Sequence, residues 1–202
     1  MANNVMSVII FREFTSDVIE KCQSILDGID QRDDQKNFGD FLVNESIVPG
    51  TLADVDSGDW SMEHVGTKWS LVTEECLQEQ PPNFSVVSAW GVPIAGIESI
   101  LKASTSDKPS IACVMYLDEG LGFTGSLVFE DGELKEKWHQ EWEDLVNLVG
   151  SRFPEVNGKW DSNDSVWTDP DAEAVFYENV QQLIAEERDA FELAAINKLI
   201  SK

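Results

Sequence analysis

Few residues of this 202-residue chain have the types and spacing that nucleophilic or metal chemistry requires. The two histidines, His64 and His139, stand far apart in the sequence. The three cysteines, Cys22, Cys76 and Cys113, form no Cys-x-x-Cys pair, and no Gly-x-Ser-x-Gly segment marks a serine nucleophile. Zinc sites and disulfide frameworks use closely spaced or even-numbered sets of such residues. We therefore predict no catalytic residue, no metal site and no cofactor, and interpret the cysteines as buried free thiols in a reducing compartment.

Two segments carry the letters of ligand-binding motifs without the context that such motifs need. Gly120, Gly122 and Gly125 have the spacing of a dinucleotide fingerprint, but we expect strands there and no following helix to hold a pyrophosphate. Asp161 and Asp164 resemble part of a calcium loop, but the glycine and the closing glutamate of such a loop are missing. We therefore expect neither a dinucleotide nor calcium to bind at these segments.

Carboxylates are the most abundant reactive group, with 38 Asp and Glu against 14 Lys and Arg and a formal net charge of -24. Such a surface repels nucleic acid and anionic lipid, because phosphate binding uses Lys and Arg to displace counterions. It attracts basic partners and speeds encounters with them. The charge is concentrated in two zones. Residues 13–60 hold twelve acids and three bases, and residues 130–173 hold thirteen acids and four bases.

We predict that these two acidic zones contact a basic partner. Carboxylates in rows can imitate duplex DNA, which carries about one charge per 1.7 Å of helix axis. The alternatives are that the charges only keep the protein soluble or adapt it to salt. The residues predicted for the first zone are Asp30, Asp33, Asp34, Asp40, Glu45, Asp54, Asp56 and Asp59, and those for the second zone are Glu130, Asp131, Glu133, Glu136, Glu141, Glu143 and Asp144.

An alternative candidate site lies in the middle of the chain, where Trp69, Trp90, Tyr116 and Glu119 fall on or next to predicted strands. Large rings on strands fill the space between a sheet and its helices, so core packing is the ordinary interpretation of the aromatic residues. The other interpretation is a groove that the four residues line for a small ligand. This groove supports the second function considered, a small-ligand-binding module or an enzyme.

The composition predicts a folded chain rather than a disordered acidic tail, since 42% of the residues are hydrophobic and seven are Trp. The length suits one domain with an appendage or two small domains. The first residues lack the basic and apolar stretches of a secretory signal, and no apolar run approaches the ~20 residues of a membrane helix. We therefore expect a cytoplasmic protein without membrane contact.

The apolar periodicity of residues 1–137 predicts an α+β domain. Strand, helix, strand, strand, helix and strand follow one another, with an extra hairpin at an Asp-Gly turn. This order is that of a ferredoxin-like split βαβ arrangement, an antiparallel sheet with two helices on one face. The strands are expected over residues 5–11, 60–72, 84–90, 111–117 and 122–129, and the helices over residues 15–29 and from Pro93 onward.

Two further segments complete the predicted domain organisation. The acidic insertion over residues 30–59 is polar and interrupted by glycine and proline, so we expect a long loop that contains a short apolar element over residues 38–43. Residues 138–202 are expected to be a helical extension, with one helix over residues 138–149 and a long one from Asp169-Pro170 to the end. The apolar face of the long helix packs either on the sheet domain or on a second subunit, so a homodimer through this helix stays open.

Three linked segments carry a resemblance to a known family: His-Val-Gly-Thr-Lys-Trp at 64–69, Ser-Ala-Trp-Gly-Val-Pro at 88–93 and Tyr-Leu-Asp-Glu-Gly at 116–120. In their order and spacing they resemble the YubB ferredoxin-like domain family, which plasmids and phages mainly encode. The chain departs from that pattern at Ser70 and Val92. The resemblance covers the middle of the chain, and it implies a ferredoxin-like fold and a mobile-element origin. It implies no established reaction.

Together these observations predict a non-enzymatic phage or plasmid protein that binds and inhibits a basic host protein in the bacterial cytoplasm. Its most specific form is a DNA mimic that blocks a defence or recombination nuclease, so the partner binds nucleic acid while this chain does not. Tryptophan is a frequent anchor in protein interfaces. The anchors expected here are Trp60, Trp142, Trp160 and Trp167.

Overall fold

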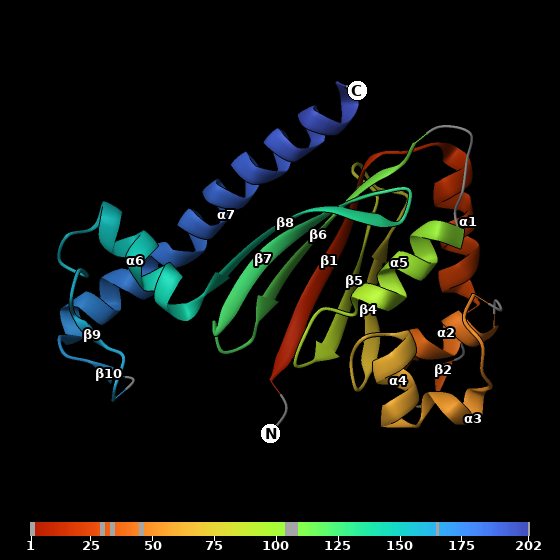
Figure 1. The fold of residues 1–202 in the computed structure, drawn as a ribbon, viewed down its shortest axis with the longest axis horizontal. Coiled ribbons are helices and arrows are strands. Elements are labelled where there is room, and N and C mark those ends of the chain that lie inside the picture. Colours follow the sequence, from red (N-terminus) through yellow and green to blue (C-terminus); the bar gives the residue numbers. More distant parts are fainter. Residues whose placement is uncertain are drawn as a thin grey trace.

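The computed structural model describes residues 3–28, 31–32, 35–44, 47–103, 109–164 and 166–201. The fold is mixed α+β, with one large antiparallel sheet and a long C-terminal helix (Figure 1). The strand order of the sheet is β2-β3-β4-β5-β1-β6-β7-β8. These strands are β1 (Asn4–Glu13), β2 (Gln31–Arg32), β3 (Gln35–Asn37), β4 (Ser70–Cys76), β5 (Asn83–Ala89), β6 (Ile111–Asp118), β7 (Phe123–Glu130) and β8 (Glu133–Glu141).

The predicted α+β class is confirmed, and the sheet is larger than the one predicted. Short strands β2 and β3 extend it beyond β4, and β7 and β8 extend it beyond β6. The complete strand order therefore differs from that of a four-stranded ferredoxin-like sheet. The expected Asp-Gly turn joins β7 to β8, where Asp131 and Gly132 both have positive φ angles of 52° and 74°. Such turns match the twist of a hairpin.

The two faces of the sheet are covered by different helices. Helices α1 (Ser16–Asp27) and α5 (Ile94–Ala103) pack on one face, and α7 (Pro170–Ile200) crosses the other (Figure 1). Strand β6 shows the alternation, because Ala112 and Val114 belong to the core under α1 and α5, whereas Ile111 and Cys113 contact α7. Both faces of β6 are thus buried.

The acidic insertion is more regular than the loop that we expected. It contains β2, β3, α2 (Phe38–Asn44) and α3 (Leu52–Val55), and β3 pairs with β4. Residues 58–64 form helix α4 (Gly58–His64) instead of the expected strand. A short helix suits this segment because Trp60 and His64 stand four residues apart, and their rings lie 4.9 Å apart.

The C-terminal part also begins differently from the prediction. Residues 138–141 continue β8, because they pair with β7 in the register Ser126–Trp138 to Phe123–Glu141, so helix α6 (Trp142–Arg152) begins at Trp142 rather than at Trp138. The segment expected as a loop after α6 contains a small hairpin, β9 (Trp160–Asp161) and β10 (Val166–Trp167).

Helix α7 begins where the sequence predicts. The Asp169 carboxylate accepts a hydrogen bond from the Asp171 backbone N–H at 3.1 Å, and Pro170 occupies the first turn. Its first half packs on α6 through Phe176, Val180 and Leu183, and its second half packs on the sheet. The helix therefore buries one apolar face within its own chain but leaves Leu193 and Ile200 exposed, and a homodimer through it stays a prediction.

One buried ionic contact fastens α7 to the sheet. The Glu192 carboxylate is 3% exposed and accepts hydrogen bonds from Arg12 of β1 at 3.0 Å and from the Ser126 hydroxyl of β7 at 2.6 Å. Burial and the nearby Glu192 charge raise the pKa of the Cys113 thiol to about 12. Cys22 is also buried, and Cys76 is partly exposed. Within the described ranges, no helix is long and apolar enough to cross a bilayer.

Candidate functional site

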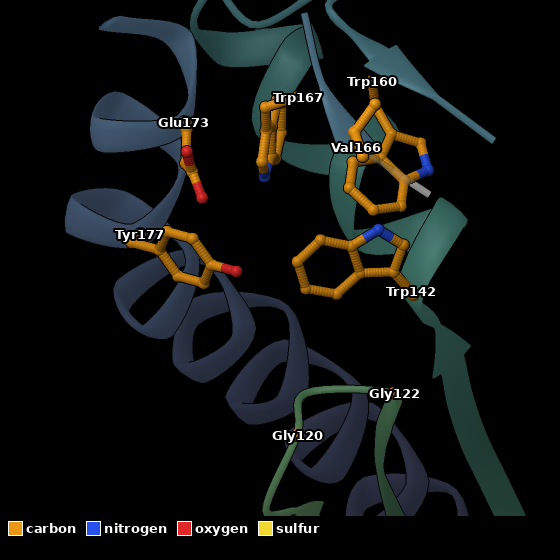
Figure 2. A pocket seen from close by; sticks show the side chains of 8 residues that line it. All are labelled: Gly120, Gly122, Trp142, Trp160, Val166, Trp167, Glu173 and Tyr177. Atoms are coloured by element: carbon orange, nitrogen blue, oxygen red, sulfur yellow. The ribbon is translucent and has the colours of Figure 1, made fainter. Parts of the chain in front are cut away.

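A hollow of about 700 Å³ opens between α6, the β9–β10 hairpin and the beginning of α7 (Figure 2). Three indole rings enclose it. The centroid of the Trp142 ring lies 5.1 Å from that of Trp160 and 6.4 Å from that of Trp167, and the last two are 5.4 Å apart. We call this hollow the aromatic pocket. Its lining residues are Gly120, Gly122, Trp142, Trp160, Val166, Trp167, Glu173 and Tyr177.

Secondary structure explains why these side chains converge. Trp160 and Trp167 are directly paired across the β9–β10 hairpin, so their rings lie on one side of it. Glu173 and Tyr177 are four residues apart on α7, so they share one helix face. Phe176 is fully buried behind them, and its ring lies 4.9 Å from Trp142. The pocket therefore has a packed apolar support.

The start of α6 fixes the third indole. The backbone N–H of Trp142 donates to the Gly122 carbonyl at 2.9 Å, which ties α6 to the turn after β6. The backbone N–H of Glu141 donates to the Asp144 carboxylate at 3.1 Å in a capping box. The turn itself is held by the Gly122 N–H, which donates to the Asp118 carboxylate at 3.0 Å. Part of the segment that resembles the YubB family thus forms one rim of the pocket.

The β9–β10 hairpin explains why Asp161 and Asp164 resemble part of a calcium-binding loop in sequence. The Asp161 carboxylate accepts hydrogen bonds from the backbone N–H groups of Asn163 at 2.9 Å and Asp164 at 3.4 Å. This is the local bonding by which Asp stabilises a turn. The carboxylate of Asp161 therefore shapes the β9–β10 turn.

The polar atoms of the pocket face a common space. Figure 2 shows the Trp167 nitrogen, the Tyr177 hydroxyl and the Glu173 carboxylate turned toward the same hollow. The Nε1–H groups of Trp142 and Trp167 are buried, and neither finds an acceptor among the described residues. Buried donors of this kind cost free energy unless something bonds to them. The pocket therefore offers the unused Trp167 donor beside one carboxylate and one hydroxyl, whereas the Trp142 nitrogen is turned toward Trp160 (Figure 2).

The surroundings of the pocket are strongly anionic. We call residues 142–187 the terminal lobe; they hold eleven Asp and Glu against Arg152 and Lys159, a net charge of -9. Both bases are engaged outside the pocket. Arg152 lies 3.7 Å from Glu187, and Lys159 lies 3.6 Å from Asp169. The pocket lining includes neither base. The site can therefore attract a cation.

The structure separates the residues predicted for the first acidic zone. Asp40 is fully buried in α2, so it cannot contact a partner. The Asp54 carboxylate caps α3 by accepting hydrogen bonds at 2.7 Å from the backbone N–H and the hydroxyl of Thr51, which lowers its pKa. Asp56 and Asp59 are exposed. The predictions for Asp30, Asp33, Asp34 and Glu45 concern residues outside those that the structure describes.

Most carboxylates of the second zone serve local contacts. Asp131 accepts a hydrogen bond from the Ser110 backbone at 2.8 Å, and Asp144 caps α6. Lysines or a histidine lie against others, while Glu143 is exposed. These pairs are Glu130 and Glu133 with Lys135, Glu136 with Lys198, and Glu141 with His139.

The four residues of the alternative groove line no common pocket among those found in the described chain. Trp90 is 54% exposed, and the ammonium of Lys68 lies 5.3 Å from its ring centroid. Tyr116 is buried, whereas Glu119 is exposed. Trp69 is half-buried beside the end of β5. Core packing and a surface contact thus account for different members of the set.

Tyr116 takes part in a hydrogen-bond chain that the sequence did not suggest. Its hydroxyl lies 2.7 Å from Nδ1 of His139, whose Nε2 lies 2.7 Å from the Glu141 carboxylate. Burial, followed by the Glu141 charge, raises the pKa of the Tyr116 phenol well above its ordinary value. A raised pKa keeps the phenol neutral, which is opposite to what an activated nucleophile needs. The chain links the sheet to the start of α6.

Of the four predicted aromatic anchors, the structure brings together Trp142, Trp160 and Trp167. Trp60 lies elsewhere, where its indole N–H donates to the Pro49 carbonyl at 3.1 Å. Sequence reasoning missed Glu173 and Tyr177. Their spacing of four residues on a predicted helix was the available signal, but nothing in the sequence showed that this helix face meets the indoles.

Comparisons of the chain with protein-family models, with curated proteins and with solved structures found no match. The resemblance to the YubB family therefore stays a prediction from the three segments that carry it. The features that bear on function are the aromatic pocket and the net negative charge of the terminal lobe.

Proposed function

We propose that this chain is a non-enzymatic binding protein that docks on a basic host protein and inhibits it. The observation that carries the proposal is the aromatic pocket, which combines three indoles and a carboxylate in a lobe of net charge -9. Aromatic rings supply large contact area and charge speeds the encounter, so the lobe has both parts of an interface. Its own bases, Arg152 and Lys159, are engaged elsewhere.

The hydrogen-bond chain of Tyr116, His139 and Glu141 supports a binding role over a catalytic one. It is the arrangement in the described residues that most resembles a nucleophile with its base. However, the raised pKa of the phenol disfavours its ionised form, and Tyr116 is 5% exposed. The small-ligand or enzymatic alternative at Trp69, Trp90, Tyr116 and Glu119 therefore has less support than the terminal lobe.

The proposal includes a plasmid or phage origin and a bacterial cytoplasmic setting, for which the support is the YubB resemblance. The finer ferredoxin-like assignment belongs to the same proposal. The supporting feature is the order β4-β5-β1-β6 at the centre of the sheet, with α1 and α5 on one face. In this interpretation β2, β3, β7 and β8 are additions to a split βαβ centre.

DNA mimicry is the narrower form of the proposal. Its support is the net charge of -24 and the exposed carboxylates such as Asp56, Asp59 and Glu143. The contact surface is placed at the terminal lobe because the aromatic pocket there contains the carboxylate of Glu173. A mimic would compete with duplex DNA for its partner, whereas a partner bound elsewhere would hold DNA at the same time.

The test is a matched charge removal followed by capture from a bacterial host lysate. One triple variant, E143Q/E173Q/E178Q, removes three charges from the terminal lobe, and the other, E20Q/E63Q/E79Q, removes three exposed charges elsewhere. We expect a basic protein to bind the unaltered chain and the second variant, with affinity that falls steeply with salt. The lobe variant should lose at least about tenfold in affinity.

The proposal is overturned if no basic protein binds or if binding is indifferent to salt. Equal losses in the two triple variants would remove the lobe from the interface. Adding a duplex oligonucleotide to the captured complex then tests mimicry, since release of the partner supports it and a stable ternary complex contradicts it.

A further inference from the structure

We propose that the aromatic pocket binds an N-methylated ammonium group, of the kind present in choline and in a trimethylated lysine side chain. The inference deepens the proposed function and rests on it for the idea that a cation is the ligand. It adds which cation the pocket accepts, and it follows from the rings, the acceptors and the donors that line the hollow.

The rings supply the principal attraction. An aromatic face is negative, so a cation over an indole is attracted, and several rings around one cation form the cages that recognise methylated ammonium groups. Trp142, Trp160 and Trp167 pack edge to face at interplanar angles of 62° to 71°, so the three indoles form one continuous aromatic wall against which a cation can lie. Tyr177 adds a fourth ring, 6.3 Å from that of Trp142.

The wall of the pocket favours a methylated cation over an unmethylated one. A primary ammonium carries three N–H donors and is strongly hydrated, and a guanidinium carries five. Acceptors line one part of the pocket, in the Glu173 carboxylate, the Tyr177 hydroxyl and the glycine carbonyls, whereas the indoles, which can only donate, line the rest. N–H donors turned toward ring faces would lose water without full replacement. Methyl groups need no acceptor, and they pack against ring faces.

The indole N–H groups that lack an acceptor indicate that the ligand carries an acceptor oxygen. The Nε1–H groups of Trp142 and Trp167 are buried without an acceptor in the described structure. The Trp167 nitrogen is the one turned toward the hollow, so a ligand with an oxygen close to its ammonium would bond to it (Figure 2). The hydroxyl of choline meets that condition, and so does a peptide carbonyl of a chain that carries trimethyllysine. The hollow of about 700 Å³ is larger than a trimethylammonium head, so it also has room for the remainder.

Glu173 balances the ligand charge. It lines the pocket four residues from Tyr177, and none of the described Lys and Arg residues lines the pocket with it. Among the described residues of the terminal lobe, both bases already pair with other carboxylates. An incoming cation therefore meets an uncompensated carboxylate.

The experiment is calorimetric titration of the full chain at constant ionic strength. The probes are choline, tetramethylammonium and ammonium chlorides, together with one short basic peptide in trimethyllysine and unmodified lysine forms. We expect each methylated probe to bind about tenfold more tightly than its unmethylated counterpart. Shifts in the indole N–H resonances of the tryptophans, assigned by single substitution, should locate binding at Trp142 and Trp167.

Three variants make the titration specific. W160L removes one wall with an apolar residue in its place, and E173Q removes the charge while it keeps the shape. W90L is the matched control, because it removes a tryptophan that is 54% exposed elsewhere. We expect W160L and E173Q to weaken choline binding at least about fivefold and W90L to leave it unchanged. A folded circular dichroism spectrum and an unshifted unfolding midpoint in E173Q exclude misfolding as the cause.

Equal affinity for methylated and unmethylated probes overturns the inference, and so does an equal loss in W90L and W160L. Tighter binding of the trimethyllysine peptide than of choline assigns the ligand to a protein, and the reverse assigns it to a small molecule. If a basic protein binds the lobe while no methylated probe does, the inference fails and the proposed function stands. If the probes bind and no basic protein does, the proposed function fails alone.

Discussion

At the end of β5 Trp90 meets the ammonium of Lys68, which lies 5.3 Å from its ring centroid. In the terminal lobe three indoles and Glu173 surround a hollow that no Lys or Arg lines. Both regions bring aromatic rings together with charge. At Trp90 the chain places its own cation, Lys68, over a single ring face. In the terminal lobe the chain supplies the aromatic rings and the carboxylate that line a hollow. The difference shows why an exposed tryptophan alone identifies no site, and why the lobe carries the functional proposal.

The backbone adds to this contrast. Trp90 has a φ angle of 63°, which is rare for a bulky residue, so its exposed position is held at some conformational cost. The three indoles of the terminal lobe have no positive φ angle, although Leu121 at the rim of the pocket has one of 58°. The aromatic pocket thus depends on side-chain packing, and packing variants should affect it most.

The largest expected effect comes from removing the support of the pocket. F176A deletes a fully buried ring that contacts Trp142 and Trp167, and such losses cost about 3–5 kcal/mol of folding free energy. Urea unfolding measures the change. Y177F is the control, because it keeps the ring, and we expect less than about 0.5 kcal/mol for it. A small effect of F176A would mean that the lobe does not need its apolar support.

Next in size is the contact that joins the lobe helix to the sheet. E192A leaves Arg12 and Ser126 without their acceptor, and we expect a loss on the order of 2 kcal/mol, since Arg12 is about one-third exposed and water replaces part of the contact. Thermal unfolding measures it. D189A, which removes a carboxylate that is 68% exposed, should be nearly neutral. Equal effects of the two variants would show that Glu192 does not fasten α7.

Gly125 of β7, which lies beside the β8 residues that lead into α6, gives the third test. A Cβ at Gly125 would lie 2.4 Å from the Trp138 carbonyl and would also collide with the Tyr116 hydroxyl, so G125A should cost about 1–3 kcal/mol. The second substitution Y116F removes the colliding hydroxyl oxygen, but the ring carbon Cζ and the Trp138 carbonyl stay too close to the added Cβ. We therefore expect partial rescue in the double variant, measured by urea unfolding. Full rescue would show that the backbone at Trp138 yields.

Alkaline pH should weaken the sheet side of α7. The folded Cys113 thiol has a pKa of about 12, whereas the unfolded thiol has an ordinary value of 9.0. As pH rises through 9.0, the unfolded chain loses this proton and the folded chain keeps it, so stability is present below pH 9 and is lost toward pH 12. Between pH 8 and pH 10 we expect a loss of about 1 kcal/mol from this residue. C113A should flatten the dependence, and an unchanged slope would contradict the assignment.

The smallest effect should come from Lys68. K68A removes a cation from one exposed ring face, and we expect about 0.5 kcal/mol or less. Iodide quenching should show a more accessible Trp90. Choline should still bind only at the terminal lobe, because a single ring face does not enclose it. New choline binding at Trp90 in this variant would remove the distinction between the two regions.

Local sequence patterns predicted most helices and strands correctly, but they did not predict the tertiary contacts between them. Alternation placed the strands over 5–11, 84–90 and 111–117, and Asp169 with Pro170 marked the start of α7, because these signals are local. Residues 60–64 were misread as strand, since a short apolar run suits either structure. The convergence of Trp142, Trp160 and Trp167 depends on the register of one hairpin and on how α7 crosses the sheet, which no local pattern contains.

The total charge indicated a basic partner, but the positions of the acidic residues in the sequence did not show which of them are free to contact it. Asp40 is buried, Asp54 and Asp144 cap helices, and Asp161 holds a turn, because short acidic side chains bond to their own backbone as readily as to a partner. Glu192 was not singled out, although it interrupts the apolar stripe that Ala195 and Leu199 continue. A lone acid within such a stripe is the signal that would have found it.

Helix α7 runs for 31 residues, roughly 46 Å, and belongs to two hydrophobic clusters that are otherwise separate. Its first half closes the lobe around Phe176, and its second half lies on the sheet through Leu199. Occupancy at one end therefore favours docking of the other end by thermodynamic linkage. Backbone amides beside Cys113 lie far from the indoles along the helix. They should exchange with deuterium more slowly when the aromatic pocket holds a cation, so exchange at one end of α7 reports ligand binding at the other end.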